Sequence, residues 1–268
     1  MFYLNKILKP KKKVNLKRVG GKNDGGYLLN INDIKSSNFF YSFGLGLDWS
    51  FEENILKIKK KQNTNFQISM FDHTIGKYFW FKNFIISFVE LLRLKKKFFY
   101  YSKKYLQLKS FLMNKQCFLY NLMVNPINLD HANIYKLKVT DLDQIFNEKN
   151  KLRESFIKID IEGAEYRILD QLIKYDDRFY GCIIEFHDID LNLEKIKIFI
   201  EKFRLDLIHT HVNNCGPLKD KNSPTQVELT FSYLPNKSDY EFSENFELPH
   251  ELDMPNHPDL RDDKISFV

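Results

Sequence analysis

The stretch Phe156–Leu169, FIKIDIEGAEYRIL, decides the fold. Its first four residues form a short apolar run, which is typical of a central strand in a parallel sheet. The next residues place Asp160, Glu162 and Glu165 around Gly163, and an apolar stripe with helical spacing then begins. The stretch therefore predicts a strand, a turn that carries carboxylates, and a helix that continues to about residue 175.

Asp160 is the first candidate for chemistry, because ligands of open α/β sheets bind at the carboxyl ends of the strands. A carboxylate that ends an apolar strand is expected to be partly buried and therefore to need a partner. Glu165 is predicted to be a solvated residue of the first helical turn, where the helix dipole favours acidic side chains. Glu162 is predicted to be either a helix cap or a reagent.

Length and composition are typical of a globular protein. The 268 residues suffice for one large α/β domain, with 43% apolar and 28% charged residues. The net charge of +6 comes largely from residues 9–17 and 93–104. Such patches indicate an anionic ligand or an anionic surface, a peripheral membrane contact included, although solvated lysines explain them equally well. The sequence contains no recognisable nucleic-acid module, so we expect no nucleic-acid partner.

Cysteine usage and hydropathy favour a cytoplasmic location. Cys117, Cys182 and Cys215 are isolated, which disfavours a disulfide framework or a zinc cluster and fits a reducing compartment. The N-terminal residues lack the apolar core of a signal peptide. The most apolar window, residues 79–92, is too short and too polar to span a bilayer.

Two glycine-rich stretches precede the central strand. In RVGGKNDGGYLL, residues 18–29, four glycines form either a plain hairpin or a lid over a ligand, with Asp24 pointing inward. In GLGLDWS, residues 44–50, Gly44 and Gly46 lie between a predicted strand at 38–43 and a predicted helix at 51–60. A Gly-x-Gly turn there lets a ligand approach the backbone and the helix N-terminus. Asp48 or Ser50 is expected to cap that helix.

Asp72 ends the next predicted strand, residues 66–71, about 25 residues after the glycines. An acidic residue at this point is placed to bind both hydroxyls of a ribose, so the two features together predict an adenosine-containing cofactor. A nicotinamide cofactor is disfavoured, because the third glycine of its fingerprint is missing and Trp49 follows instead.

Residues 76–116 interrupt the sheet pattern with an aromatic, lysine-rich segment that is predicted to be helical. We interpret it as an insertion that covers one face of the sheet and forms either a substrate cap or the surface of a homodimer. Ordinary packing is the simpler role for its aromatic residues.

Further elements follow on either side of the central strand. Strands are predicted at 117–124 and 181–188, with helices at 137–146, introduced by Thr140, and at 193–203. Residues 207–214 alternate, which places His209 and His211 on one face, and a strand at 226–233 pairs with them. The tail, residues 249–268, is predicted to lie extended against the domain.

These motifs together resemble the FkbM-like class of S-adenosylmethionine-dependent methyltransferases. The resemblance rests on RVGGKNDGGYLL, FYSFGLGLDWSFE, FDHT, FIKIDIEGAEYRIL, IIEFH, HTHVNN and LDMPN. The sequence is similar in particular to bacterial members of this class that modify surface sugars. It implies a single domain over residues 1–268 with the α/β class I methyltransferase fold, which is Rossmann-like. In that fold a mostly parallel seven-stranded sheet ends in an antiparallel last strand.

The resemblance also implies a cofactor site. It puts the methionine end of S-adenosylmethionine at Phe43 to Asp48 and the ribose at Asp72, although Asp48 stands where a third glycine often occurs. With the motifs above, the predicted cofactor-binding residues are Asp24, Phe43, Gly44, Leu45, Gly46, Asp48, Ser50, Asp72 and His73.

Methyl transfer to a sugar hydroxyl requires alignment of the two reactants and a proton acceptor or a metal ion. We predict Asp160 and His187 as catalytic residues, His187 being the general base. Asp160, Glu185 and His211 are predicted to hold Mg²⁺ or Mn²⁺ or to polarise the acceptor. The alternative is that His187 and His209 are hydrogen-bonded sheet residues.

The leading functional prediction is an O-methyltransferase that acts on a sugar, either nucleotide-linked or within a capsular or lipopolysaccharide glycan. An anionic or nucleotide-linked acceptor would suit the basic patches. Two alternatives stay open. One is methylation of a phosphoramidate or an amine of a surface glycan, and the other is a non-catalytic binding protein with the same fold.

Overall fold

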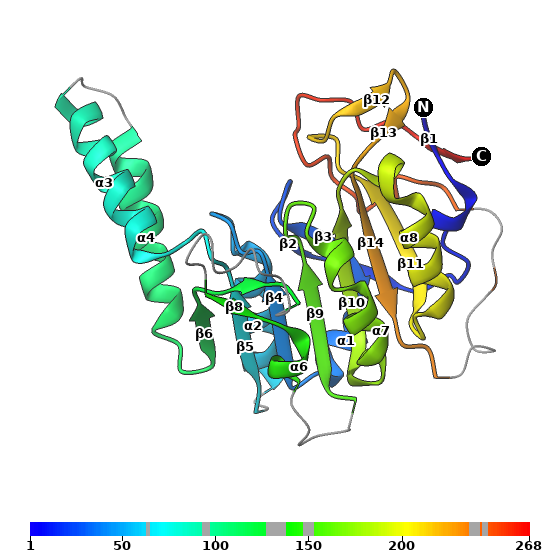
Figure 1. Ribbon diagram of the computed structural model, residues 1–268, viewed down its shortest axis with the longest axis horizontal. Helices are drawn as coiled ribbons and strands as arrows, with labels where there is room; N and C mark the ends of the chain where they lie inside the picture. The colour runs from blue at the N-terminus through cyan, green and yellow to red at the C-terminus, as the bar shows by residue number, and fades with distance from the viewer. Residues whose placement is uncertain (63–64, 93–96, 127–137, 147–152, 236–241, 243–245) are drawn as a thin grey trace.

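A seven-stranded sheet runs through the centre of the protein (Figure 1). The computed structural model describes residues 1–62, 65–92, 97–126, 138–146, 153–235, 242 and 246–268. In order across the sheet, the strands are β11 (Asp206–Val212), β14 (Val227–Ser232), β10 (Phe179–Phe186), β9 (Ser155–Ile159), β4 (Phe39–Phe43), β5 (Gln67–Phe71) and β6 (Cys117–Tyr120).

Strand direction confirms the predicted fold class. β14 runs antiparallel to both of its neighbours, β10 and β11, whereas the other neighbouring strands of this sheet pair in parallel. β14 is also the last of the seven strands in the sequence. The protein therefore has the mostly parallel sheet with an antiparallel last strand that defines the class I methyltransferase fold.

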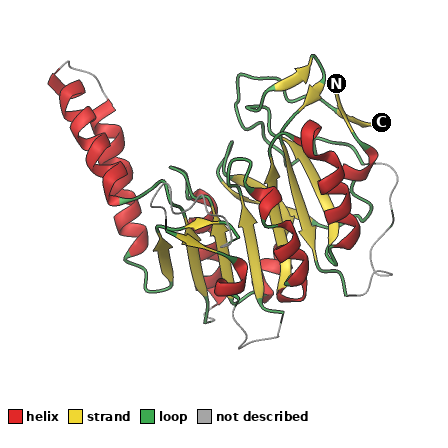
Figure 2. Cartoon of the chain, viewed as in Figure 1, coloured by secondary structure: helices red, strands yellow, loops and turns green. Residues whose placement is uncertain are grey.

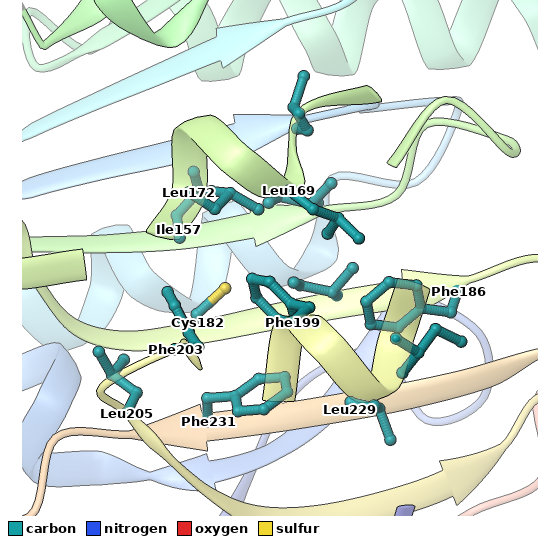
Figure 3. Close-up of a cluster of buried hydrophobic side chains, with 14 of the residues drawn as sticks. Ile157, Leu169, Leu172, Cys182, Phe186, Phe199, Phe203, Leu205, Leu229 and Phe231 are labelled. Carbon is teal, nitrogen blue, oxygen red and sulfur yellow. The ribbon is translucent and has the colours of Figure 1, made fainter. Parts of the chain in front are cut away.

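Helices cover both faces of the sheet (Figure 2). One face packs against α1 (Ile31–Ser36) and α2 (Ser50–Gln62). The other face packs against α6 (Leu142–Ile145), α7 (Leu169–Lys174) and α8 (Ile189–Lys202). Figure 3 shows the second cluster, in which Phe199 of α8 stacks on Phe203 and meets Phe231 of β14 edge to face. Burial of these aromatic rings, together with the aliphatic side chains of the same cluster, stabilises this side of the sheet.

Short strand pairs lie outside the main sheet. They are β1 (Phe2–Leu4) with β15 (Ile265–Phe267), β2 (Leu16–Gly20) with β3 (Gly26–Asn30), β7 (Met123–Val124) with β8 (Val139–Thr140), and β12 (Leu218–Asp220) with β13 (Ser223–Pro224). Three 3₁₀ helices are η1 (Lys6–Leu8), η2 (Glu165–Arg167) and η3 (Asp176–Arg178).

Two long helices, α3 (Lys77–Leu92) and α4 (Lys97–Leu112), occupy most of residues 76–116. They were expected to cover one face of the sheet, but the pair projects beyond the edge at β6 (Figure 1). Only the base of the pair joins the core, through Trp80, Leu108 and Phe111. No helix among the described residues is both long enough and apolar enough to cross a membrane.

The helix predicted at 137–146 is much shorter than expected. Leu137 lies outside the described residues, and Thr140 ends β8, where it pairs with Val124. Asp141 is the cap of α6 instead, because its Oδ1 accepts a hydrogen bond of 2.9 Å from the backbone N–H of Gln144.

Candidate active site

A cavity of about 520 Å³ opens at the carboxyl ends of β4, β5 and β9. Parallel strands gather their following turns at this edge, which is where open α/β sheets bind ligands. The predicted cofactor residues that line it are Asp24, Gly44, Leu45, Gly46, Asp48, Asp72 and His73, and Asp160 lines it as well. Phe43 and Ser50 lie outside this lining. Phe43 is fully buried in the core, and the Ser50 hydroxyl lies 3.4 Å from the Gly25 carbonyl oxygen.

The Gly44–Gly46 turn needs both glycines. Gly44 has φ +78° and Gly46 has φ +58°, the left-handed region that favours glycine. A Cβ on Gly44 would lie 1.6 Å from the backbone oxygen of Asp160, whereas one on Gly46 would meet nothing within 4 Å. Gly44 therefore brings the turn against the end of β9, and Gly46 leaves backbone open toward the cavity. The N–H of Ser50, at the start of α2, donates to Asp48 Oδ1 over 2.9 Å.

The Asp72 carboxylate joins two turns of the cavity wall. Its Oδ2 accepts from the backbone N–H groups of Leu45 and Gly46, each over 3.0 Å. Its Oδ1 accepts from the N–H and the hydroxyl of Thr74 and from the Ile75 N–H. Burial alone would raise the pKa of Asp72, but these donors hold it below its usual value. Five donors fill the hydrogen-bonding capacity of a carboxylate. Asp72 therefore holds the two turns together, and its contact with a ribose stays a prediction.

The glycine-rich stretch at 18–29 forms a hairpin whose turn is also a wall of the cavity. β2 and β3 make the hairpin, and Asp24, Gly25 and Tyr27 line the cavity. Asn256 of the tail holds the turn through two hydrogen bonds. The Asp24 N–H donates to the Asn256 carbonyl oxygen over 3.3 Å, and the Asn256 side-chain amide donates to Asp24 Oδ1 over 3.4 Å. Burial raises the pKa of Asp24. The structure therefore confirms the hairpin, whereas a role as a lid over a ligand stays a prediction.

Asp160, Glu185 and His187 form a cluster of groups able to bind a metal. One ligand atom from each lies within 4.8 Å of the others, and it is the one such group found among the described residues. His187 Nε2 lies 3.8 Å from Glu185 Oε1 and 3.6 Å from Oε2 of Glu162, whose side chain is largely exposed. Asp160 follows β9, Glu185 lies near the end of β10 and His187 follows β10, so they come together because the two strands are neighbours in the sheet.

Glu165 fixes the orientation of the His187 ring. Its Oε1 lies 2.5 Å from His187 Nδ1, and the glutamate is completely buried. The prediction of a solvated Glu165 was therefore wrong. Residues 165–167 form a 3₁₀ turn and α7 begins only at Leu169, so the helical phase assumed for Glu165 does not apply. Burial alone would lower the pKa of His187, but the nearby carboxylates, Glu165 first, raise it to about 9.

His211 belongs to a neighbouring cluster. Its Nδ1 lies 3.3 Å from Glu228 Oε2 and its Nε2 lies 3.7 Å from Asp262 Oδ1. β14 lies between β10 and β11, so Glu228 stands opposite Glu185 on one side and opposite His211 on the other. The structure thus groups His187, and not His211, with Asp160 and Glu185. His209 Nε2 contacts Asp253 Oδ1 over 3.0 Å, in line with the alternative of a hydrogen-bonded sheet residue.

Comparison with known proteins identifies a family within this chain. Residues 116–216 match the model of the methyltransferase FkbM domain. The match agrees with the resemblance drawn from the motifs and covers the middle part of the chain. It runs from β6 to just beyond β11, so it contains Asp160, Glu165, Glu185 and His187. The glycine turn and Asp72 lie before it.

Two solved structures are similar to the chain at low identity. Precorrin-6y C5,15-methyltransferase from Geobacter metallireducens is 11% identical, with 76% of this chain and 85% of that chain covered and a TM-score of 0.36. TYW2 from M. jannaschii, in complex with AdoMet, is 12% identical, with 83% and 88% covered and a TM-score of 0.30. No curated protein matches the chain.

Lys158 is a site residue that the sequence reasoning missed. It is buried in β9, lines the cavity, and donates from Nζ to the Gly44 carbonyl over 2.7 Å and to Asp160 Oδ2 over 3.2 Å. Burial opposes its charge, but Asp160, Glu52 and Glu185 raise the pKa of Lys158 above its usual value. A lone charged residue inside an apolar strand was the signal, because buried lysines need acidic partners.

Proposed function

We propose that this chain is an S-adenosylmethionine-dependent methyltransferase that moves a methyl group to a hydroxyl of a sugar, in a nucleotide-linked sugar or a capsular or surface polysaccharide. The observation that carries the proposal is one cavity that joins the Gly44–Gly46 turn to Asp160, with the Glu185–His187 pair behind it. The methyltransferase FkbM domain at 116–216 supports the reaction type.

The residues present fit S-adenosylmethionine. The open backbone at Gly46 suits the methionine end, which Gly44 to Asp48 would hold. Phe71, Leu122 and Met123 form an apolar wall that suits the adenine ring. The Asp72–His73 segment lies where the ribose is expected, although five protein donors already occupy the Asp72 carboxylate.

The chemistry asks the protein to align and to accept a proton. The bond from the acceptor oxygen to the methyl carbon forms as the sulfur–methyl bond breaks, and the hydroxyl proton leaves. Asp160 lines the cavity and can therefore contact an acceptor placed there. His187, oriented by Glu165, is the proton acceptor that we propose. Because its pKa is raised to about 9, only its neutral form accepts the proton, so turnover without a cation should increase as the pH rises toward 9.

As an alternative to the role of His187 as proton acceptor, Asp160, Glu185 and His187 fit a divalent cation, which would occupy His187 Nε2. Two carboxylates and one imidazole suit Mg²⁺ or Mn²⁺, and Glu165 leaves His187 Nε2 directed toward the carboxylates of Glu185 and Glu162. A cation held there would lower the pKa of the acceptor hydroxyl. His211 lies outside this group, where it is the positively charged partner of Glu228 and Asp262.

Calorimetric titration with S-adenosylhomocysteine, with and without Mn²⁺, tests the proposal. We expect micromolar binding to the wild type and at least tenfold weaker binding to Gly46→Leu, whose side chain enters the cavity. Gly163→Leu is the matched control, because Gly163 also has positive φ and open space but lies outside the cavity lining. Failure of folded wild type to bind in both conditions would overturn the enzyme reading.

A second titration decides the role of Asp72. If its carboxylate contacts the ribose, Asp72→Asn reduces the preference for S-adenosylhomocysteine over the 2′,3′-dideoxy analogue. If it only holds the two turns, both ligands weaken by the same factor and the preference is unchanged.

Transfer assays with labelled cofactor then test the acceptor. We expect methyl transfer to nucleotide-activated or polymeric sugars, with an O-methyl product by mass spectrometry. An N-methyl product from an amino sugar would show that the acceptor is an amine and not a hydroxyl. Full turnover after EDTA treatment would remove the cation from the mechanism.

A further inference from the structure

The outer face of α3 is apolar and exposed. Tyr78, Phe81, Ile85 and Phe88 are 77%, 64%, 51% and 58% exposed, and Ile86 beside them is 44% exposed. Their spacing of three and four residues puts the first four on one stripe of the helix. Five large apolar side chains on about three turns of one helix form a continuous patch, and patches of this kind mark a binding surface.

The inner face of α3 is already in use. Phe79 meets Tyr101 and Phe84 meets Tyr105, both on α4, and Trp80 packs on Tyr105 as well. The helix is therefore apolar on two opposite sides, of which α4 covers one. A helix that is apolar all round needs a cover for its second side as well.

Positive charge is concentrated in the same segment. Residues 77–116 contain ten lysine and arginine residues and a single acidic residue, Glu90. The net charge of this segment is therefore more positive than the +6 of the whole chain. The rest of the chain is therefore net acidic. On α3 itself, Lys77 and Lys82 are exposed and lie one residue from Tyr78 and Phe81, beside the apolar stripe.

The position of the pair leaves this face accessible. α3 and α4 project beyond the β6 edge, away from the sheet (Figure 1). The base of the pair borders the candidate active site, because Lys104 Nζ donates to the Leu47 carbonyl over 2.8 Å and lies over the Trp49 ring. Leu47 lines the cavity. The pair thus connects an exposed apolar and basic surface to the wall of the site.

We propose that the Tyr78–Phe88 face of α3 docks on the surface of an anionic phospholipid bilayer. Aromatic and aliphatic side chains on one face with lysines at its margin suit the interface between headgroups and acyl chains. Association of two copies through this face is disfavoured, because it brings together two segments with the same large positive charge. The docked helix lies along the membrane, since no described helix is able to span it.

Vesicle sedimentation of the full chain tests this inference independently of cofactor binding. We expect at least tenfold stronger binding to vesicles of phosphatidylglycerol and phosphatidylcholine than to phosphatidylcholine alone, and weaker binding at high salt. Phe81→Ser/Phe88→Ser should lose at least tenfold, because both side chains are exposed on the docking face. Leu191→Ser, which removes a 78% exposed leucine from α8, should bind like the wild type.

Two results would overturn the inference. The first is that the wild-type protein binds S-adenosylhomocysteine but does not sediment with anionic vesicles. The other is a dimer in lipid-free solution that Phe81→Ser/Phe88→Ser converts to monomer, because a second copy would then cover the face. Circular dichroism establishes that each variant is folded, and S-adenosylhomocysteine titration separates this test from that of the proposed function.

Discussion

Glu165 controls which atoms of His187 are available. The buried contact of 2.5 Å to Nδ1 holds the ring, so that Nε2 faces Glu185 and Glu162. A carboxylate behind an imidazole fixes its tautomer and increases its basicity, and loss of such a partner typically costs ten- to a hundredfold in metal affinity.

We therefore predict that Glu165→Gln weakens Mn²⁺ binding at least tenfold, because the amide keeps the shape of the side chain and loses its charge. Isothermal titration with MnCl₂ measures the effect. Asp170→Asn is the matched control, since this variant also loses a carboxylate but at an exposed position of α7. Equal affinities of wild type and Glu165→Gln would show that Glu165 has no influence on a cation site.

Individual residues differ in how far sequence can predict them. Asp160 was found from its position after an apolar strand, and the structure puts it in the cavity lining. Glu165 was missed because its burial depends on a 3₁₀ turn, which residue spacing does not reveal. Lys158 was missed because its partners, the Gly44 carbonyl and Asp160, come from two different strand ends.

At the scale of elements, the turn after β4 depends on contact with the end of β9. We predict that Gly44→Ala lowers the free energy of unfolding by about 3 kcal/mol or more, since the added Cβ would overlap the Asp160 backbone oxygen. Gly163→Ala has a similar positive φ without any close neighbour, so it should cost only about 1–2 kcal/mol. Urea denaturation measures both variants, and equal losses would contradict the predicted clash.

The short helix α1 carries a second testable feature, the buried carboxyl of Asp33. Burial raises the pKa of Asp33 to about 8, well above its value in an unfolded chain. Between about pH 4 and pH 8 the folded state therefore holds a proton that the unfolded state has released, and stability falls as pH rises through this range.

We expect Asp33→Asn to remove this dependence, so that between pH 5 and pH 8 the variant loses about 2–4 kcal/mol less stability than the wild type. Urea titrations at both pH values measure the difference. Asp259→Asn, at an exposed position in the tail, should behave like the wild type. Parallel pH profiles of Asp33→Asn and wild type would mean that Asp33 ionises normally in the fold.

Elements were easier to predict than the contacts between them. Apolar runs bounded by turns are local, so the sheet strands were found and differ from prediction mainly where β6 ends at Tyr120 and β7 follows. The membership of the Asp160, Glu185 and His187 cluster is not local. It depends on β14 lying between β10 and β11, which separates His211 from Glu185 by the width of a strand.

At the scale of the whole molecule, the tail is held by a charged network across the sheet. His211 contacts Glu228 of β14 and Asp262 of the tail, and His209 contacts Asp253. Burial alone would lower the pKa of His211, but Asp262, Glu228 and Asp253 raise it to about 10. Its contribution to stability is therefore complete below about pH 6.5 and is lost as pH rises through about 10.

We predict that His211→Gln lowers stability at pH 7 by about 2–4 kcal/mol and that the difference from the wild type shrinks as pH rises from 7 to about 10. Thermal melts across this range measure it, and hydrogen exchange of residues 249–263 reports whether the tail is released. His257→Gln, at an exposed position of the same tail, is the control. A difference that stays constant from pH 7 to pH 10.5 would contradict a charged His211.

The hold of Asn256 on the Asp24 turn has a consequence for protein synthesis. The two residues are 232 positions apart, yet together they complete one wall of the cavity. On a translating ribosome, the sheet strands can all emerge before this wall is secured. A chain in which β14 has joined the sheet but residues 249–263 have not yet docked therefore has a formed sheet and an unsecured cavity wall.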